Sequence, residues 1–195
     1  MMRTVLMLLF SYLLGSLPTG FLLGILSGTD VRKIGSGNIG ATNVARVAGW
    51  KLGITTLLAD AAKGLIPVLV SIWTGFSLTV AVFTALAAFL GHLYPVFLKF
   101  KGGKGVATAL GVLVALAPMA TAILLSAFAL VAAVSRTVSL ASLTAAALAP
   151  LLLWLLSYPQ PLRWMGLALA MFIFIRHREN IRRLISGNES RFGTV

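Results

Sequence analysis

The chain has 195 residues, of which 59% are hydrophobic and 10% are charged. A soluble domain is about half apolar and about a quarter charged, so this composition excludes an ordinary soluble globule or a disordered chain and indicates a protein lying mostly inside a membrane. Lys and Arg number 16 against 4 acidic residues, and the lack of cysteine excludes disulfides, zinc–thiolate sites, iron–sulfur clusters and a catalytic thiol.

The apolar runs predict membrane-spanning helices, each of which needs about 20 apolar residues. The first run, residues 4–26, is too long for a signal peptide and no A-x-A cleavage site follows it. The other apolar runs lie at residues 53–73, 76–98, 106–134, 138–156 and 162–175. The polar segments between and after them lie at residues 27–52, 99–105 and 176–195. No internal repeat is visible, so we expect residues 1–195 to form a single domain.

Basic residues gather in the three polar segments, and Lys and Arg in short loops mark the cytoplasmic side of a membrane. We therefore expect all three segments in the cytoplasm and the N-terminus outside. The chain must then cross an even number of times between Lys104 and Arg176, although only three runs are visible there. The run 106–134 is long for one span and contains Pro118, and proline breaks or kinks a helix.

A break at Pro118 gives an all-α integral membrane protein with seven transmembrane helices. Residues 106–117 make only about 18 Å of helix, so this piece would have to start below the membrane surface or be re-entrant. The alternative is one kinked helix over 106–134, with one of the later runs lying in the membrane interface.

The first polar segment contains Gly35-x-Gly37-x-x-Gly40, formally the glycine pattern of a dinucleotide-binding fold. That fold needs a preceding strand and an acidic residue about 20 positions further on, whereas a membrane helix precedes this segment and Asp60 lies in an apolar run. The physics that remains is anion binding, because glycines let backbone amides converge on an anion. Side chains suited to the same task are Ser36, Asn38, Thr42, Asn43 and the guanidinium of Arg46. For this segment alone, a flexible capped turn with Arg46 among lipid headgroups explains the sequence equally well.

The second polar segment is a short glycine loop with lysines, Lys101-Gly102-Gly103-Lys104-Gly105. It is not a Walker A loop, because no Ser or Thr follows the lysine and the upstream glycine spacing differs. Its amides, its ammonium groups and the N-terminus of the following helix are typical of a phosphate cradle. The alternative is a basic membrane anchor, which needs the lysines and leaves the glycines unexplained.

The third polar segment predicts a basic helix after the last span. His177, Asn180, Ile181 and Leu184 recur at helical spacing, which places His177 and Asn180 on one face. Arg178, Arg182 and Ile185 fall on an adjacent face, and Gly187 is typical of the residue that follows a helix. The alternative is a juxtamembrane helix that binds anionic lipid.

Three ionisable residues fall inside the apolar runs. Asp60 and Lys63 are three positions apart on one helix face, so they can neutralise each other or a neighbour. His92 lies about two turns before Lys99. Ionisable residues in a membrane usually face the interior of a helix bundle, and we expect a structural or supporting role for all three.

Together, the three polar segments resemble the signatures of the PlsY family, the bacterial acyl-phosphate-dependent glycerol-3-phosphate acyltransferases. Those signatures are matched in order and without a mismatch at residues 35–46, 101–105 and 177–189, and the surroundings of Asp60, Lys63 and His92 also resemble the family. The resemblance implies transfer of a fatty acyl group from acyl phosphate to the 1-hydroxyl of glycerol 3-phosphate. The product is lysophosphatidic acid, made in the first committed step of bacterial phospholipid biosynthesis.

The resemblance also implies a set of site residues. The expected catalytic residues are Ser36, Arg46, Lys104, His177 and Asn180. The expected substrate-binding residues are Gly37, Asn38, Gly40, Thr42, Asn43, Lys101, Gly102, Gly103 and Gly105. The residues expected to support them are Asp60, Lys63, His92, Arg182 and Glu189. No metal or other cofactor is implied.

The implied partners are acyl phosphate, glycerol 3-phosphate, membrane lipid and the soluble enzyme that makes acyl phosphate, and no nucleic acid. The implied location is the bacterial inner membrane, with a site facing the cytoplasm. Acyl phosphate is already activated, so we expect direct attack by the hydroxyl without an acyl-enzyme. Either His177 or an oxygen of acyl phosphate could accept the proton, and we favour the second. Two alternatives from other classes are an anion transporter or channel, and a non-catalytic lipid-binding anchor.

Overall fold

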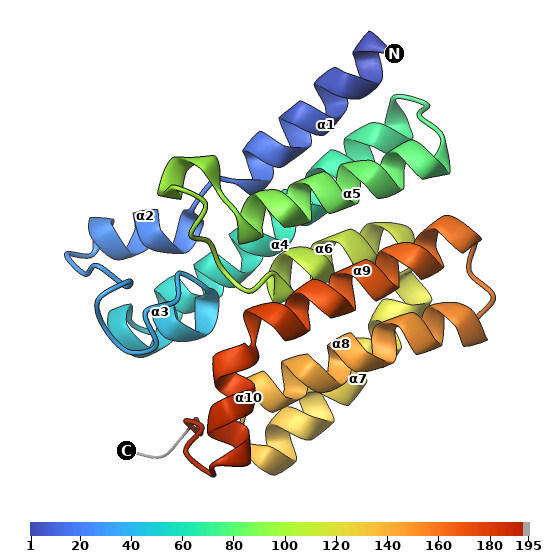
Figure 1. Cartoon of the computed structure of the whole chain (residues 1–195). Helices are drawn as coiled ribbons and strands as arrows, with labels where there is room; N and C mark the ends of the chain where they lie inside the picture. Colours follow the sequence, from blue (N-terminus) through green and yellow to red (C-terminus); the bar gives the residue numbers. More distant parts are fainter. Residues whose placement is uncertain (193–195) are drawn as a thin grey trace. The chain divides into compact units, whose positions relative to one another are not determined.

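A computed structural model describes residues 1–192 of the chain, and all its regular elements over this range are helices. Their order is shown in Figure 1. The helices are α1 (Met2–Gly15), α2 (Thr19–Leu26), α3 (Ala41–Ala48), α4 (Trp50–Trp73), α5 (Leu78–Leu93), the 3₁₀ turn η1 (Val96–Leu98), α6 (Val106–Leu116), α7 (Pro118–Ser135), α8 (Val138–Leu155), α9 (Gln160–Arg176) and α10 (Arg178–Ile185). The prediction of an all-α protein is confirmed.

Five helical stretches in the described range are long and apolar enough to cross a membrane. They are Met2–Leu26, Trp50–Trp73, Leu78–Leu98, Pro118–Ser135 and Val138–Leu155. The apolar helix α6 has 11 residues, or about 16 Å of length, and α9 has 17. The count of seven crossings and the outward N-terminus stay predictions.

The contacts divide the chain into two compact units, Met1–Ala115 and Leu116–Val195. The division falls two residues before the predicted break, where α6 ends at Leu116, α7 begins at Pro118, and Ala117 between them is not helical, with φ −146° and ψ 60°. The predicted end of one helix and start of another at Pro118 is therefore confirmed. The single domain over residues 1–195 stays a prediction.

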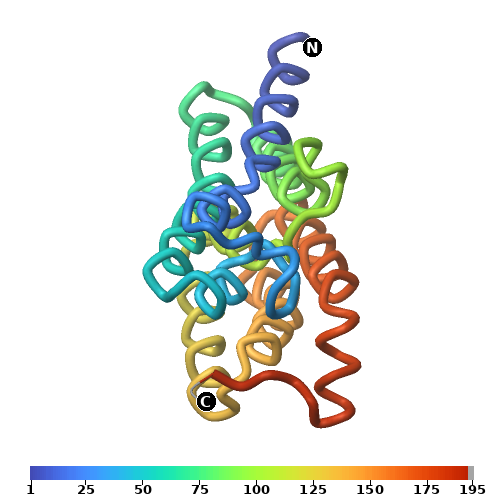
Figure 2. The backbone as a smooth tube through the Cα atoms, turned by 90° about the vertical axis from the view of Figure 1, so that its left-hand side faces the viewer, coloured from blue at the N-terminus to red at the C-terminus, as the bar shows by residue number. Residues whose placement is uncertain are grey.

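In the first unit α1 and α5 run in the same direction, and α4, which packs against both, runs antiparallel to them (Figures 1 and 2). At one end, the Arg3 guanidinium lies 5.4 Å from the ring centroid of Phe76 and reaches the carbonyl of Thr74. Towards the other end, the Tyr12 hydroxyl donates a 2.8 Å hydrogen bond to the carbonyl of Tyr94. Two glycine-rich segments, residues 30–46 and the lysine loop at residues 99–105, emerge at the end of the first unit that lies opposite the N-terminus.

Glycines let these helices approach closely. A Cβ on Gly91 would collide with the carbonyl of Tyr12, and one on Gly15 would collide with the backbone of Ala88. The contact between α4 and α6 is built in the same way, because a Cβ on Gly111 would collide with the carbonyl of Ala61. Small residues at helix interfaces are typical of membrane proteins, in which packing replaces the hydrophobic effect as the driving force.

The predicted single helix over residues 4–26 is in fact two helices, α1 and α2, separated by residues 16–18. The reason is Pro18, which has no backbone N–H to continue the helical ladder. The carbonyl of Leu14 accepts instead from the amide of Leu17, and α2 starts in a new direction at Thr19. Proline ends a helix at Pro18 as it does at Pro118, but a break was predicted only at Pro118.

The second unit packs α8 between α7 and α9, and α10 follows α9 after a change of direction at His177. Trp154 of α8 and Trp164 of α9 meet edge to face, with ring centroids 6.4 Å apart. After α10 the chain returns to the turn between α7 and α8, where the amide of Phe192 donates a 2.9 Å bond to the carbonyl of Arg136 (Figure 2). Arg136 and the basic tail thus lie at the same end of this unit, as the predicted topology requires.

Candidate functional site

The first glycine-rich segment is folded around the side chain of Asn43, which is only 2% exposed. Its amide nitrogen donates to the carbonyls of Val31, Ile34 and Asn38, at 2.8, 3.2 and 2.9 Å. Its amide oxygen accepts a 2.8 Å bond from the backbone N–H of Ser36. We expected Asn43 to offer a donor to the substrate, and in the structure its donors are directed to the segment itself.

The same segment rests on a small apolar core and turns at two glycines. Val31, Ile39 and Val44 are buried together. Gly35 and Gly37 have φ values of +65° and +69°, a conformation that costs glycine little and other residues much more. Ser36, between these glycines, is exposed, and so is Arg46 near the end of α3. The fold therefore presents a hydroxyl and a guanidinium at the surface of an internally bonded segment.

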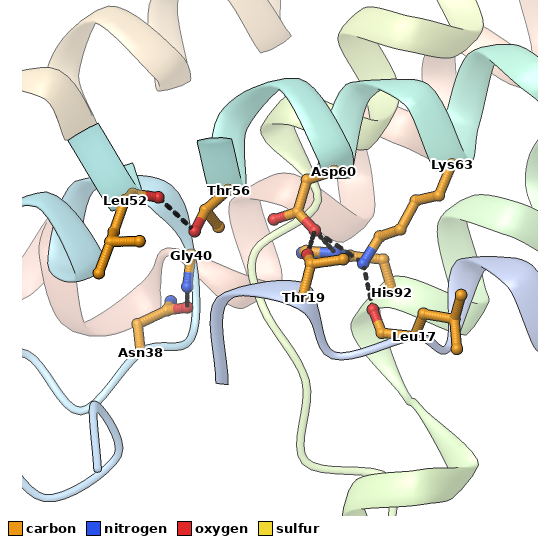
Figure 3. Close-up of polar contacts among 9 residues, drawn as sticks. All are labelled: Leu17, Thr19, Asn38, Gly40, Leu52, Thr56, Asp60, Lys63 and His92. Carbon is orange, nitrogen blue, oxygen red and sulfur yellow. Dashed lines mark hydrogen bonds and ion pairs between the residues drawn. The ribbon is translucent and has the colours of Figure 1, made fainter. Parts of the chain in front are cut away.

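Two further side-chain contacts stabilise turns of this segment. The Asn38 carboxamide oxygen accepts a 2.9 Å bond from the amide of Gly40 (Figure 3). Asp30 accepts two 2.9 Å bonds from the guanidinium of Arg32, which also lies 4.2 Å from the ring centroid of Phe21. The hydrogen bond from Arg32 lowers the pKa of Asp30 to about 2. This ion pair is exposed, and its role is local.

The lysine loop, residues 99–105, folds back on the end of α5. The amides of Gly102 and Gly103 donate 3.1 Å bonds to the carbonyls of Leu93 and His92. Lys99 and Phe100 are both left-handed, with φ values of 51° and 62°, and Gly105 has a φ of +86°. Lys101 is exposed and Lys104 is partly exposed. Gly102 and Gly103 therefore use their amides to shape the loop that carries Lys101 and Lys104.

The two glycine-rich segments are neighbours in the first unit. Leu98, the last residue of η1, packs against the core of Val31, Ile39 and Val44. The lysine loop begins at the next residue. The family resemblance implies that residues of both segments serve one site, and this contact brings the two segments to the same end of the unit.

Thr19, Asp60, Lys63 and His92 form a buried polar cluster in the first unit (Figure 3). Asp60 and Lys63 of α4 form a 2.8 Å ion pair, the contact that their spacing allows. The Thr19 hydroxyl donates a 2.5 Å bond to the same carboxylate oxygen, and His92 Nδ1 lies 3.7 Å from it. Lys63 Nζ also donates a 2.9 Å bond to the carbonyl of Leu17. Asp60, Lys63 and His92 are predicted supporting residues. Thr19 is not among them, although its position directly after Pro18 was an available signal.

The third motif forms the junction of α9 and α10 in the second unit. His177 and Asn180 are both buried, at 3% and 5% exposure. His177 Nδ1 lies 2.8 Å from the carbonyl of Ile173. A carbonyl oxygen only accepts, so Nδ1 carries a hydrogen in this arrangement. The sequence placed His177 and Asn180 on one helix face, and the structure buries both.

Glu189 ties this junction to α8. Its carboxylate accepts bonds of 2.7 Å from the Ser139 hydroxyl, 2.5 Å from Asn180 Nδ2 and 2.6 Å from Arg183 Nε. Burial opposes its ionisation, but the bonds from Asn180, Ser139 and Arg183 outweigh burial and lower the pKa of Glu189. Arg182, a predicted supporting residue, is exposed, and its role stays a prediction. Arg183 and Ser139, which bond to Glu189, were not predicted from the sequence.

The predicted catalytic residues are divided between the units. Ser36, Arg46 and Lys104 belong to the first unit, and His177 and Asn180 belong to the second. Among residues 1–192, no three His, Asp or Glu side chains are grouped so that they could hold a metal ion.

The chain is similar to glycerol-3-phosphate acyltransferases along nearly its whole length. A family model described as glycerol-3-phosphate acyltransferase matches residues 5–187. A glycerol-3-phosphate acyltransferase of Trichlorobacter lovleyi is 52% identical over 182 residues, which cover 93% of this chain and 94% of the relative. One from Geobacter sulfurreducens is 48% identical over 192 residues, covering 98% and 99%.

Two solved structures are also similar over nearly the whole chain. Both are crystal structures of PlsY, an integral membrane glycerol 3-phosphate acyltransferase, in a glycerol 3-phosphate form and a lysophosphatidic acid form. Each is 44% identical to this chain and covers 98% of it, with 96% of the PlsY chain matched. The TM-scores are 0.95 and 0.92. The predicted integral membrane architecture is thereby confirmed.

Proposed function

This chain belongs to the glycerol-3-phosphate acyltransferase family, and on that premise we propose that it transfers a fatty acyl group from acyl phosphate to the 1-hydroxyl of glycerol 3-phosphate. The product is lysophosphatidic acid, and relatives solved in glycerol 3-phosphate and lysophosphatidic acid forms support both ends of the reaction. We propose that the enzyme works in the inner membrane of a bacterium, with its polar segments on the cytoplasmic side.

The observation that best supports this proposal is the contact of Leu98 with the core under the first glycine-rich segment. It brings exposed Arg46 and Ser36 to the same end of the first unit as Lys101 and Lys104. Both proposed substrates carry phosphate, so their mutual repulsion must be offset before they can react. Cationic groups and donors fixed in advance provide that stabilisation without reorganising during the reaction.

We propose direct transfer. The 1-hydroxyl oxygen attacks the acyl carbonyl carbon and forms the ester bond, the carbon–oxygen bond to phosphate breaks, and phosphate leaves with the hydroxyl proton on one of its oxygens. Arg46 and Lys104 stabilise phosphate charge, and Ser36 donates a hydrogen bond. We include His177 and Asn180 among the catalytic residues because they belong to the third sequence motif. Within residues 1–192 no hydrogen bond joins Ser36 to an Asp or His side chain, and on this ground we propose that Ser36 is not the nucleophile.

The test is acyl transfer to labelled glycerol 3-phosphate by purified protein in lipid, with palmitoyl phosphate and palmitoyl-CoA as alternative donors. We expect lysophosphatidic acid from palmitoyl phosphate only. Arg46→Ala should lower the rate by about a hundredfold or more, as is typical when a fixed electrostatic group is removed. Arg3→Ala is the matched control, because Arg3 lies at the opposite end of the first unit and should leave the rate unchanged. No product from either donor in folded protein would overturn the proposal and favour anion transport.

A further inference from the structure

The buried cluster of Thr19, Asp60, Lys63 and His92 has no direct part in the proposed reaction, yet it joins the elements that carry both glycine-rich segments. Asp60 and Lys63 come from the middle of α4, Thr19 from the start of α2, and His92 from the end of α5. Asp60, Lys63 and His92 are at most 4% exposed. Charges are costly to bury in a membrane protein, so a cluster of this kind needs an explanation.

One arm of the cluster leads to the first glycine-rich segment. Lys63 donates to the carbonyl of Leu17 at the break before Pro18, and Thr19 bonds to Asp60. These two contacts fix the start of α2. The next residue, Gly20, lies so close to the carbonyl of Ile39 that a Cβ would overlap it. The position of α2 therefore sets the position of the segment that contains Ser36.

The other arm leads to the lysine loop. The imidazole of His92 approaches Asp60 through Nδ1 and lies directly against Gly103, where a Cβ would overlap the ring. The backbone carbonyl of His92 accepts the amide of Gly103. Gly103 precedes Lys104, so the placement of this imidazole sets the path of the loop at that lysine.

We propose that Asp60 is a positioning residue that holds the two glycine-rich segments in register, through Thr19 on one side and His92 on the other. Within the cluster, the carboxylate of Asp60 is the group that reaches all three of the others: it accepts a bond from Thr19, pairs with Lys63 and lies 3.7 Å from His92 Nδ1 (Figure 3). Binding of two anions at a common site requires that their ligands keep a fixed spacing, and a displacement of about 1 Å can cost about a hundredfold in rate. This inference rests on the proposed function for its kinetic consequences and on geometry alone for its structural ones.

The structural test is hydrogen–deuterium exchange of purified protein in detergent or lipid discs, followed by mass spectrometry. In Asp60→Asn we expect at least tenfold faster exchange in peptides covering residues 36–40 and 102–103. His92→Ala should accelerate exchange at 102–103 and leave 36–40 unchanged, whereas Thr19→Val should do the reverse. Ser71→Ala is the matched control, since Ser71 is a buried polar residue three turns further along α4.

The kinetic test is the transfer assay on the same variants. We expect Asp60→Asn to lower kcat/KM for glycerol 3-phosphate about 10- to 100-fold, with Ser71→Ala within about twofold of the unchanged protein. If Asp60→Asn does not fold, Asp60→Asn with Lys63→Met removes the unpaired charge and permits both measurements. Unchanged exchange in both segments, or acceleration spread evenly over α1, α4 and α5, would overturn the inference. Absence of acyl transfer in the unchanged protein would instead overturn the proposed function, and the exchange pattern would still decide on positioning.

Discussion

Replacing Asn43 by alanine should release the first glycine-rich segment while leaving the helices in place. The change removes two N–H donors, which reach the carbonyls of three residues, and one oxygen that accepts a bond, all of them directed to backbone groups between residues 31 and 38. A hydrogen bond contributes about 1 kcal/mol net, so the two donors and one acceptor together are worth about 3 kcal/mol. Ile34 and Ser36 lie in an exposed stretch where water can replace part of this, and we therefore expect a loss of about 2–3 kcal/mol.

A loss of this size multiplies the equilibrium constant for local opening by about 30 to 140, at about 1.4 kcal/mol for each factor of ten. The assay is hydrogen exchange of the amides of Ser36, Gly37 and Gly40, with thermal unfolding of the whole protein measured alongside. Asn38→Ala is the graded control, because it removes one bond, to the amide of Gly40. It should change opening only about fivefold.

The comparison of these two variants can refute the reasoning. If Asn43→Ala opens the segment no more than Asn38→Ala does, the side chain does not organise the segment. If Asn43→Ala abolishes acyl transfer while exchange at Ser36 stays unchanged, Asn43 acts on the substrate, as the sequence first suggested.

Three further predictions concern other parts of the molecule. The pKa of Glu189 is lowered in the folded protein, so the stabilisation from its ionised carboxylate is present above the ordinary glutamate pKa and is lost as pH falls through the folded value. Proteolysis of the segment after α10 should therefore accelerate on acidification in the unchanged protein and be insensitive to pH in Glu189→Gln. Gly91→Ala should lower the unfolding temperature by several degrees more than Gly28→Ala, because a Cβ on Gly91 would collide with the backbone of α1. A Cβ on Gly28 meets open space, so that variant carries only the cost of its left-handed φ. Equal shifts in differential scanning fluorimetry would contradict close packing of α1 and α5. His177→Gln keeps a side-chain donor and should retain measurable turnover if the phosphate of the donor accepts the proton; turnover below detection with intact substrate binding would identify His177 as the base.

Much of the architecture follows from local sequence. Apolar runs give the helices, because a backbone in lipid must satisfy its own hydrogen bonds. Pro118 marks a helix boundary that the charge distribution independently required, and Pro18 marks another for the same chemical reason. The three motifs can be recognised in the sequence because each one shapes the backbone over only a few residues. Together they identify the family.

The roles of individual polar residues depend on tertiary contacts that no local pattern contains. Asn43 has the composition of a substrate ligand, but the chain turns so that carbonyls up to 12 residues away meet its amide. Asp60 and Thr19 are 41 residues apart, and Ser139 and Glu189 are 50 apart, so only the folded chain shows that they bond. Sequence periodicity specifies which face of a helix a side chain occupies. Which distant segment lies against that face is decided by packing, and here close approaches at glycines set it.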